Sequence, residues 1–249
     1  MTTIVHLDGR PLFSFDGGDV RDAIHRATEE GVDLAGASLA GADLHGADLE
    51  DAGLAGADLT GARLDGANVE DADLSGAKLD DASARGANFE NAAMPGASLV
   101  RANLDGTNFE SADLKDATLD GARAVRANFE RARLTGARAR EAVLRSSNLE
   151  RCEMTGVDLS KADLSGANLE RCDLREAQLI LANLAGSNVE KADLRGADLS
   201  GADLTEAHLE KCEVDGACLD GAKLGGAHMG RMNGRLRSRG AGGEEGPYR

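Results

Sequence analysis

The most regular feature of the sequence is a spacing of five between its apolar positions, which runs without a break from residue 32 to residue 229. A small residue, usually alanine, stands at every fifth position, and a larger apolar residue follows two positions later, as Leu34, Leu39 and Leu44 do. This period fits neither a helical stripe nor a long alternating strand. It fits a short extended segment whose small and large residues both point inward before a corner. We therefore predict a solenoid.

The outward positions indicate how many segments complete one coil, because the same side chains recur every twenty residues. One such column holds Glu50, Glu70, Glu90, Glu110, Glu130, Glu150, Glu170, Glu190 and Glu210. A second, two positions earlier, holds Asn68, Asn88, Asn108, Asn128, Asn148, Asn168 and Asn188. Four pentapeptides thus make one coil, and about forty pentapeptides make about ten coils, or roughly 48 Å of rod. We expect the Asn column to form a ladder of amide hydrogen bonds and the inward Phe89, Phe109 and Phe129 to stack in the core.

The repeated motif A-[D/N]-L-x-x, seen as A-D-L-H-G and A-D-L-E-D near the start of the run, resembles that of the pentapeptide-repeat family. The resemblance covers residues 32–230 and implies a right-handed, four-sided β-helix. We accordingly expect an all-β solenoid over residues 32–230, preceded by a small domain of residues 1–31. Residues 231–249 are rich in Gly and Arg and are expected to form a flexible tail.

The first 31 residues lie outside the repeat and predict a hairpin followed by a helix. Two β-prone runs, residues 4–7 and 11–15, flank an Asp-Gly turn. Asp19 is a good N-cap for a helix over residues 20–30. We interpret this unit as a cap over the open end of the solenoid, where exposed strand edges favour aggregation. The alternative is that it binds a partner.

Composition and charge restrict the classes further. Only 2% of the residues are aromatic and Trp is absent, which suits a narrow tube and not a wide globular core. The net charge is −16. Most of it lies in residues 32–120, which hold 18 acidic and 5 basic residues, whereas residues 121–230 hold 18 and 15. The first half of the rod is therefore predicted to be strongly acidic.

One corner of the coil differs from the other three. Three corners often carry Gly, which suits a turn with positive φ, but the corner after the Glu column never does. In the second half of the rod this corner carries Arg or Lys, which can neutralise the glutamates. In the first half it carries further acidic residues. The candidate partner-binding edge is Glu50, Asp51, Glu70, Asp71, Glu90 and Glu110; a merely solvated edge is the alternative.

Other outward side chains give weaker indications. Eight arginines between Arg123 and Arg151 fall on several faces and form a girdle, without the stripe and aromatic platforms that nucleic-acid binding needs. We therefore expect no direct binding to nucleic acid. Ile180 and Leu181 occupy outward positions that are otherwise polar or Gly, and they are a candidate apolar contact or an ordinary surface pair.

The sequence carries no pattern typical of catalysis, of a cofactor or of a metal centre. Cys152, Cys172 and Cys212 point inward and are interpreted as small core residues. His208 and His228 lie outward one coil apart, but we predict no metal site from them. No signal peptide or membrane-spanning segment is visible, and four cysteines suit a reducing compartment, so we expect a cytoplasmic protein.

The family resemblance makes the functional expectation more specific. Members that confer quinolone resistance or immunity to topoisomerase poisons are acidic rods about as wide as duplex DNA, and they bind DNA gyrase by imitating DNA. The resemblance thus implies a non-enzymatic rod with a protein partner, most concretely DNA gyrase. A structural or regulatory scaffold for an unrelated protein is the alternative. Some members also pair through their C-terminal ends, which leaves a homodimer through the last coil open.

Overall fold

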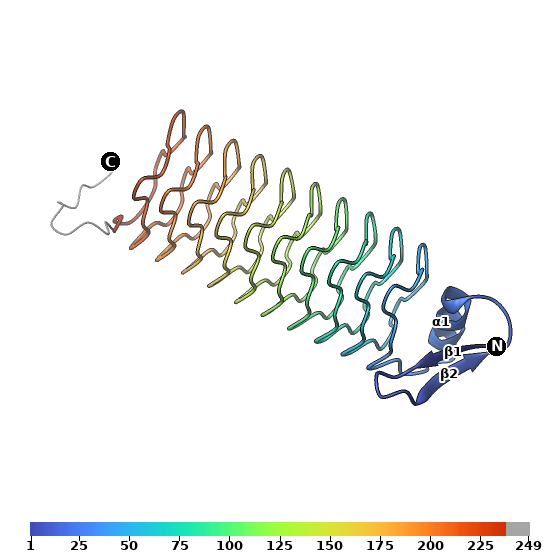
Figure 1. Ribbon diagram of the computed structural model, residues 1–249. Helices are drawn as coiled ribbons and strands as arrows, with labels where there is room; N and C mark the ends of the chain where they lie inside the picture. Colours follow the sequence, from blue (N-terminus) through green and yellow to red (C-terminus); the bar gives the residue numbers. More distant parts are fainter. Residues whose placement is uncertain (238–249) are drawn as a thin grey trace.

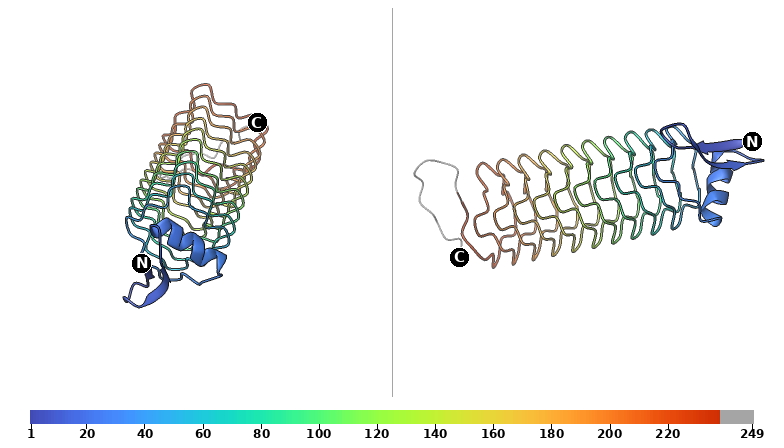
Figure 2. Two further views of the ribbon diagram at one scale, coloured as in Figure 1. Left: turned by 90° about the vertical axis from the view of Figure 1, so that its right-hand side faces the viewer. Right: turned by 90° about the horizontal axis from the view of Figure 1, so that it is seen from below.

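A computed structural model describes residues 1–237 and shows a rod of stacked coils with a small unit of three elements at its N-terminal end (Figure 1). Isolated parallel bridges join residues twenty apart on all four sides, for example Ser38 with Asp58 and Asn88 with Asn108. The view nearest the rod axis shows the four-sided outline of the coils (Figure 2). The predicted period of twenty residues per coil is therefore confirmed.

Each side is held to the next coil by a recurring set of three backbone hydrogen bonds, one of which comes from the corner amide, as from Asp51 to the carbonyl of Glu70 at 3.0 Å. The amide of Leu49 donates to the carbonyl of Asn68 at 2.7 Å, and the amide of Asn68 donates to the carbonyl of Ala47 at 2.9 Å. Because these bonds link neighbouring coils, every segment is extended for only a few residues yet is fully paired above and below.

The inside of the rod is filled by the small and large residues of the repeat, as predicted. The rings of Phe89 and Phe109 lie 5.2 Å apart and those of Phe109 and Phe129 4.9 Å apart, both stacked. The coil of Phe129 carries Ala124 and Ala139 where Leu is usual, and these alanines offset the volume of the ring. The compensation leaves an apolar void of about 10 Å³ lined by all three residues.

The Asn column forms the expected ladder and is more completely bonded than the sequence indicated. The Asn128 side chain donates to the Asn108 Oδ1 at 3.0 Å, and its own Oδ1 accepts from Asn148 at 3.0 Å. The same Oδ1 also accepts the backbone amide of Glu130 at 3.2 Å. An internal side chain of this column therefore fixes both its own corner and the distance to the next coil.

Aspartates just before the central apolar residue brace other corners. The carboxylate of Asp203 accepts the hydroxyl and amide of Thr205 and contacts the Lys223 ammonium at 3.0 Å. The Thr205 hydroxyl, the Lys223 ammonium and the Thr205 amide together hold the pKa of Asp203 at about 2, below its usual 3.8. The charged form of this carboxylate is thus part of the folded structure.

The N-terminal unit consists of β1 (Thr2–Val5), β2 (Pro11–Phe15) and α1 (Val20–Glu29). The hairpin and helix are seen as expected, although β1 ends earlier than residue 7. His6 leaves the hairpin because it bridges Ala37 of the first coil in antiparallel fashion. Ala23, Ile24 and Ala27 of α1 are buried. The unit therefore pairs with one edge of the first coil and packs an apolar helix face inward.

At the other end, pairing continues beyond residue 230, where the sequence pattern decays. Asn233 bridges Glu213 in the normal register, whereas Arg237 bridges Cys218 with one residue fewer. Met232 and Leu236 pack against the core although both are partly exposed. The predicted flexible tail otherwise falls on residues 238–249, which lie outside the described residues. The homodimer through the last coil stays a prediction.

The amide ladder predicts a measurable contribution to stability. Replacing Asn128 by Ala removes four hydrogen bonds. It also leaves the side-chain amide of Asn148 and the backbone amide of Glu130 without their Asn128 acceptor. We expect a loss of about 2 kcal/mol in the free energy of unfolding, measured by urea denaturation. Asn103→Ala is the control, because the Asn103 side chain accepts the corner hydrogen bond from the Asp105 backbone amide but is not part of the ladder. Equal losses for both variants would contradict a role for the ladder.

The Asp203 carboxylate predicts a pH-dependent contribution. Its folded pKa lies below the unfolded one, so its stabilisation is present above about pH 4 and is lost as pH falls from about 4 to about 2. Asp203→Asn is therefore expected to lower the unfolding midpoint at pH 7 and to match the wild type at pH 2. Thermal denaturation at both pH values measures the effect, and a constant difference would disprove it.

Candidate partner-binding edge

The Glu edge, defined as the Glu column together with the corner residue that follows each glutamate, runs along one corner of the rod. The nine corner residues that follow a glutamate, and Arg231, which follows Gly230 in the next coil, have a left-handed backbone with φ between 56° and 64°, and none of the ten is Gly. They are Asp51, Asp71, Asn91, Ser111, Arg131, Arg151, Arg171, Lys191, Lys211 and Arg231. The other three corners use Gly in most coils for the same conformation.

The glutamates of this edge have a structural role that the sequence did not indicate. The amide of Asn68 donates to Glu50 at 3.1 Å, and that of Asn88 donates to Glu70 at 3.0 Å. Glu90 accepts from Asn108 at 3.2 Å in the same way. One oxygen of each carboxylate is therefore engaged by the next coil, which explains why Glu persists in a column of like charges.

In the C-terminal half the edge is neutralised, as the sequence predicted. The Arg131 guanidinium lies 3.3 Å from both Glu110 and Glu130, bridging two successive coils. The Lys191 ammonium lies 2.7 Å from Glu170, and this hydrogen bond lowers the pKa of that glutamate. Arg151 and Arg171 each lie within 4 Å of two glutamates in the same manner. Here the two columns form one ion-pair network.

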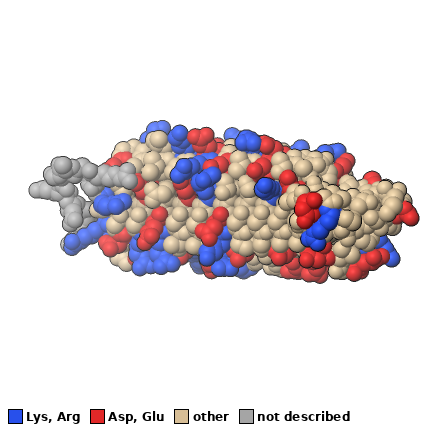
Figure 3. Space-filling view, turned by 60° about the horizontal axis from the view of Figure 1, so that its bottom comes forward, with Lys and Arg blue, Asp and Glu red and all other residues tan. Residues whose placement is uncertain are grey.

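In the N-terminal half the same edge has no counter-charge. Among residues 1–237, five of the six candidate residues make no ion pair: Glu50, Asp51, Glu70, Asp71 and Glu90. Glu110 is the exception, because Arg131 reaches it. Asp51 and Asp71 are exposed at the corner. Figure 3 shows one face of the rod, with acidic side chains gathered along part of its N-terminal half and both signs interspersed towards the C-terminal end.

The acidic surface extends onto the N-terminal unit. A cavity of about 200 Å³ lies between α1 and the first coil of the edge. His25, Thr28 and Glu29 of the helix line one side, and Asp48, Glu50 and Asp51 line the other. The helix therefore prolongs the Glu edge beyond its first coil and makes a shallow recess with four carboxylates.

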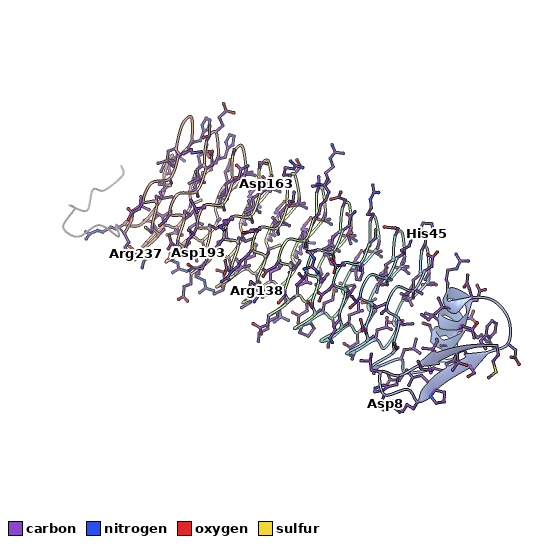
Figure 4. All side chains as sticks on the ribbon, viewed as in Figure 1. Asp8, His45, Arg138, Asp163, Asp193 and Arg237 are labelled. Carbon is purple, nitrogen blue, oxygen red and sulfur yellow. The ribbon has the colours of Figure 1, made fainter. Side chains whose placement is uncertain are left out.

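The arginine girdle is engaged in ion pairs between coils. Arg123 lies 2.8 Å from Asp105, and Arg138 lies 2.7 Å from Asp120. Arg133 reaches Asp113 at 2.8 Å on another face. Figure 4 shows Arg138 among the side chains that project from the rod. These guanidinium groups neutralise carboxylates of neighbouring coils, and their spread over several faces agrees with the predicted girdle.

Ile180 and Leu181 form the candidate apolar contact. Leu181 is 58% exposed and has a left-handed backbone with φ of 59°. Its Cδ2 lies 2.7 Å from where a Cβ on Gly201 would stand, so the side chain rests over the next coil. Ile180 is half-buried beside it. The pair is thus outward, as expected.

The cysteines agree with their interpretation as core residues. All four are buried free thiols. The Cys152 Sγ donates to the carbonyl of Phe129 at 2.8 Å, and burial raises the pKa of the Cys212 thiol to about 12. Such thiols are unreactive at neutral pH. No helix in the described part of the chain is long and apolar enough to cross a membrane.

Comparison with known proteins identifies the repeat. Models for pentapeptide repeats match residues 30–66, 52–91, 85–121 and 112–151, and a model for a pentapeptide repeat region matches residues 142–219. No curated protein sequence matched the chain.

Three solved structures illustrate the range of similar proteins. HetL, a pentapeptide repeat protein involved in heterocyst differentiation regulation in the cyanobacterium Nostoc, is 32% identical over 87% of this chain and 95% of its own, with a TM-score of 0.42. QnrB1, a plasmid-mediated fluoroquinolone resistance protein, is 22% identical over 66% and 85%, with a TM-score of 0.36. A pentapeptide repeat protein of the Arabidopsis thaliana thylakoid lumen is 27% identical over 42% and 66%, with a TM-score of 0.25.

The family models together span most of the chain, and the sequence period, the four-sided coil and the inward Ala and Leu columns lie in the same residues. The chain therefore belongs to the pentapeptide-repeat family, whose fold is a right-handed quadrilateral β-helix.

Proposed function

We propose that the protein is a non-enzymatic rod that uses the N-terminal half of the Glu edge to bind a cationic, DNA-binding surface of another protein. DNA gyrase is the specific candidate, because it is the partner that resemblance to the quinolone-resistance members implies. The observation that carries the proposal is the run of unneutralised carboxylates at a corner whose backbone favours Gly. A gyrase partner also entails a cytoplasmic location.

The backbone at this corner supports a role beyond folding. A left-handed conformation costs an L-residue on the order of 1 kcal/mol, less for Asp and Asn. Arg131 and its basic successors offset this cost with ion pairs. Asp51 and Asp71 have no such compensation among the described residues, although Gly serves at the other corners of the same coils. Their charge is retained at a cost to the fold.

The density of charge on this edge is close to that of DNA. The coils of Asp51 and Asp71 each carry two carboxylates of this edge over about 4.8 Å, or roughly one negative charge per 2.4 Å. Duplex DNA carries about one per 1.7 Å of its axis. A surface that binds phosphates with Lys and Arg would therefore meet a comparable field, and the field would also accelerate association.

A scaffold for an unrelated protein is the second candidate function, and Leu181 favours it. A leucine that is 58% exposed in a left-handed conformation contributes little to the core and carries a conformational cost. Together with Ile180 it offers a small apolar anchor on a different corner from the Glu edge. This surface suits a partner with an apolar pocket.

The gyrase proposal is tested by reversing charges that the fold does not use. Asp51→Lys with Asp71→Lys spares the glutamates that hold the Asn ladder, because neither aspartate side chain forms a hydrogen bond or ion pair with another residue in the range 1–237. We expect the protein concentration that half-inhibits gyrase supercoiling to rise about tenfold or more, equivalent to about 1.4 kcal/mol. The assay uses gyrase of matched source, with and without a quinolone.

The matched control for this experiment is Glu176→Lys with Glu206→Lys. These glutamates are exposed, have φ of 58° and 57° at two other corners, and give the same change in net charge. If both double variants weaken the effect equally, net charge and not the Glu edge is responsible. If the wild type has no effect on gyrase, the partner is another protein.

The scaffold alternative predicts an opposite response of stability and binding at Leu181. Leu181→Gly removes the conformational cost of a leucine in the left-handed region, so we expect the free energy of unfolding to rise by about 0.5 kcal/mol in urea denaturation. The same variant should weaken binding to a partner held by the apolar pair. A loss of stability would show instead that packing over Gly201 is the reason for the leucine.

A further inference from the structure

The Asn column ends in two histidines near the C-terminal end of the rod. Asn188 is its last asparagine, and its amide donates back to Asn168 at 3.0 Å. In the next two coils His208 and His228 take the same position, and their rings lie 4.6 Å apart with an angle of 2° between them. Parallel stacked imidazoles cannot continue the ladder, because their N–H donor and acceptor nitrogen lie in the ring plane and do not point towards the ring of the next coil.

The Glu210 carboxylate faces the Nδ1 atoms of both rings. Its Oε2 is 3.8 Å from the Nδ1 of His208, and its Oε1 is 4.0 Å from the Nδ1 of His228. Both distances are too long for hydrogen bonds. The Oε2 atom is buried and has no hydrogen-bond partner among the described residues. A buried carboxylate oxygen without a donor is costly unless a cation satisfies it.

We propose that His208, Glu210 and His228 bind one divalent transition-metal ion, with zinc as the preferred metal. One ligand atom from each residue lies within 4.8 Å of the other two. Ligands at about 2.0–2.2 Å around a tetrahedral zinc stand roughly 3.4 Å apart, so the three groups need to close by only about 1 Å. The donor set of two imidazoles and one carboxylate suits zinc and leaves a fourth position open.

The side chains have the freedom that this closure needs. His208 is 47% exposed and His228 is 58% exposed, so either ring can tilt out of the parallel arrangement towards a common ion. The nearest carboxylate of the preceding coil, that of Glu190, is 3.7 Å from Lys191 and is therefore already balanced. Glu210 is the glutamate of the column that remains for the metal.

The position of the site gives it a purpose in this fold. A terminal coil has a neighbour on one side only, so it is the first to open. A metal held by His208 and His228 would join two successive coils where the amide ladder stops. The site would thereby hold the last coils closed in place of the Asn bonds, and metal binding would stabilise the folded chain.

The test is titration of the full chain, without an affinity tag, with ZnCl₂ and separately with CoCl₂. We expect one equivalent to bind with a dissociation constant of about 10 µM or tighter, to give the visible absorption of tetrahedral cobalt, and to raise the melting temperature. His208→Asn and His228→Asn should each weaken binding at least about tenfold. Both replace histidine by the residue that fills this column in earlier coils, so the fold is preserved.

His25→Asn and His45→Asn are the controls, because these histidines lie on other elements and should leave binding unchanged. Three results would overturn the proposal: no saturable binding by the wild type, binding that survives in both column variants, or equal loss in the controls. If His208→Asn raises the melting temperature without metal and zinc leaves the wild type unchanged, the histidines are only an interruption of the ladder.

Discussion

Backbone hydrogen bonding between successive coils is the constraint on which the rest of this structure depends. Each side of a coil donates to the side twenty residues ahead and accepts from it, as Leu49 and Asn68 do. Since every coil must match its neighbours, the coil length stays at twenty residues up to the bridge of Glu213 with Asn233, and among the described residues only the last pairing, Cys218 with Arg237, is one residue shorter. The same constraint places every side chain directly over its counterpart, so chemistry in this rod comes in columns.

Because side chains stack in columns, a charged surface residue lies next to residues of the same charge in the neighbouring coils. Stacked glutamates repel one another. An Asn side chain of the next coil donates to the glutamates from Glu50 to Glu130, and Arg or Lys neutralises the column in the C-terminal half. In the N-terminal half, Glu50, Glu70 and Glu90 accept hydrogen bonds from these Asn side chains but form no ion pair within residues 1–237. The contrast between two halves of one corner, built on the same backbone, is the observation on which the proposed partner-binding edge rests.

The two ends of the rod break the periodicity in different ways. At the N-terminal end a hairpin bridges the first coil and α1 buries Ile24, so an open edge is paired and an apolar section is covered. The helix also brings Glu29 beside Asp51 and enlarges the acidic surface. Towards the C-terminal end the Asn ladder gives way to stacked histidines around Glu210. At both ends, residues that close the rod therefore stand next to a proposed site.

The sequence alone determined the architecture, because a strict period admits only one coil length and assigns each residue to the inside or the outside. It therefore predicted the Asn ladder, the Phe stack, the ion pairs of Arg131 and the exposure of Leu181. The tertiary structure decided what depends on side-chain direction across coils. It showed that Glu70 accepts from Asn88, that Asp51 stands in a left-handed conformation, and that His208 and His228 converge on Glu210. The contacts between coils join residues eighteen or twenty positions apart, and a period gives their column but not the orientation of their atoms.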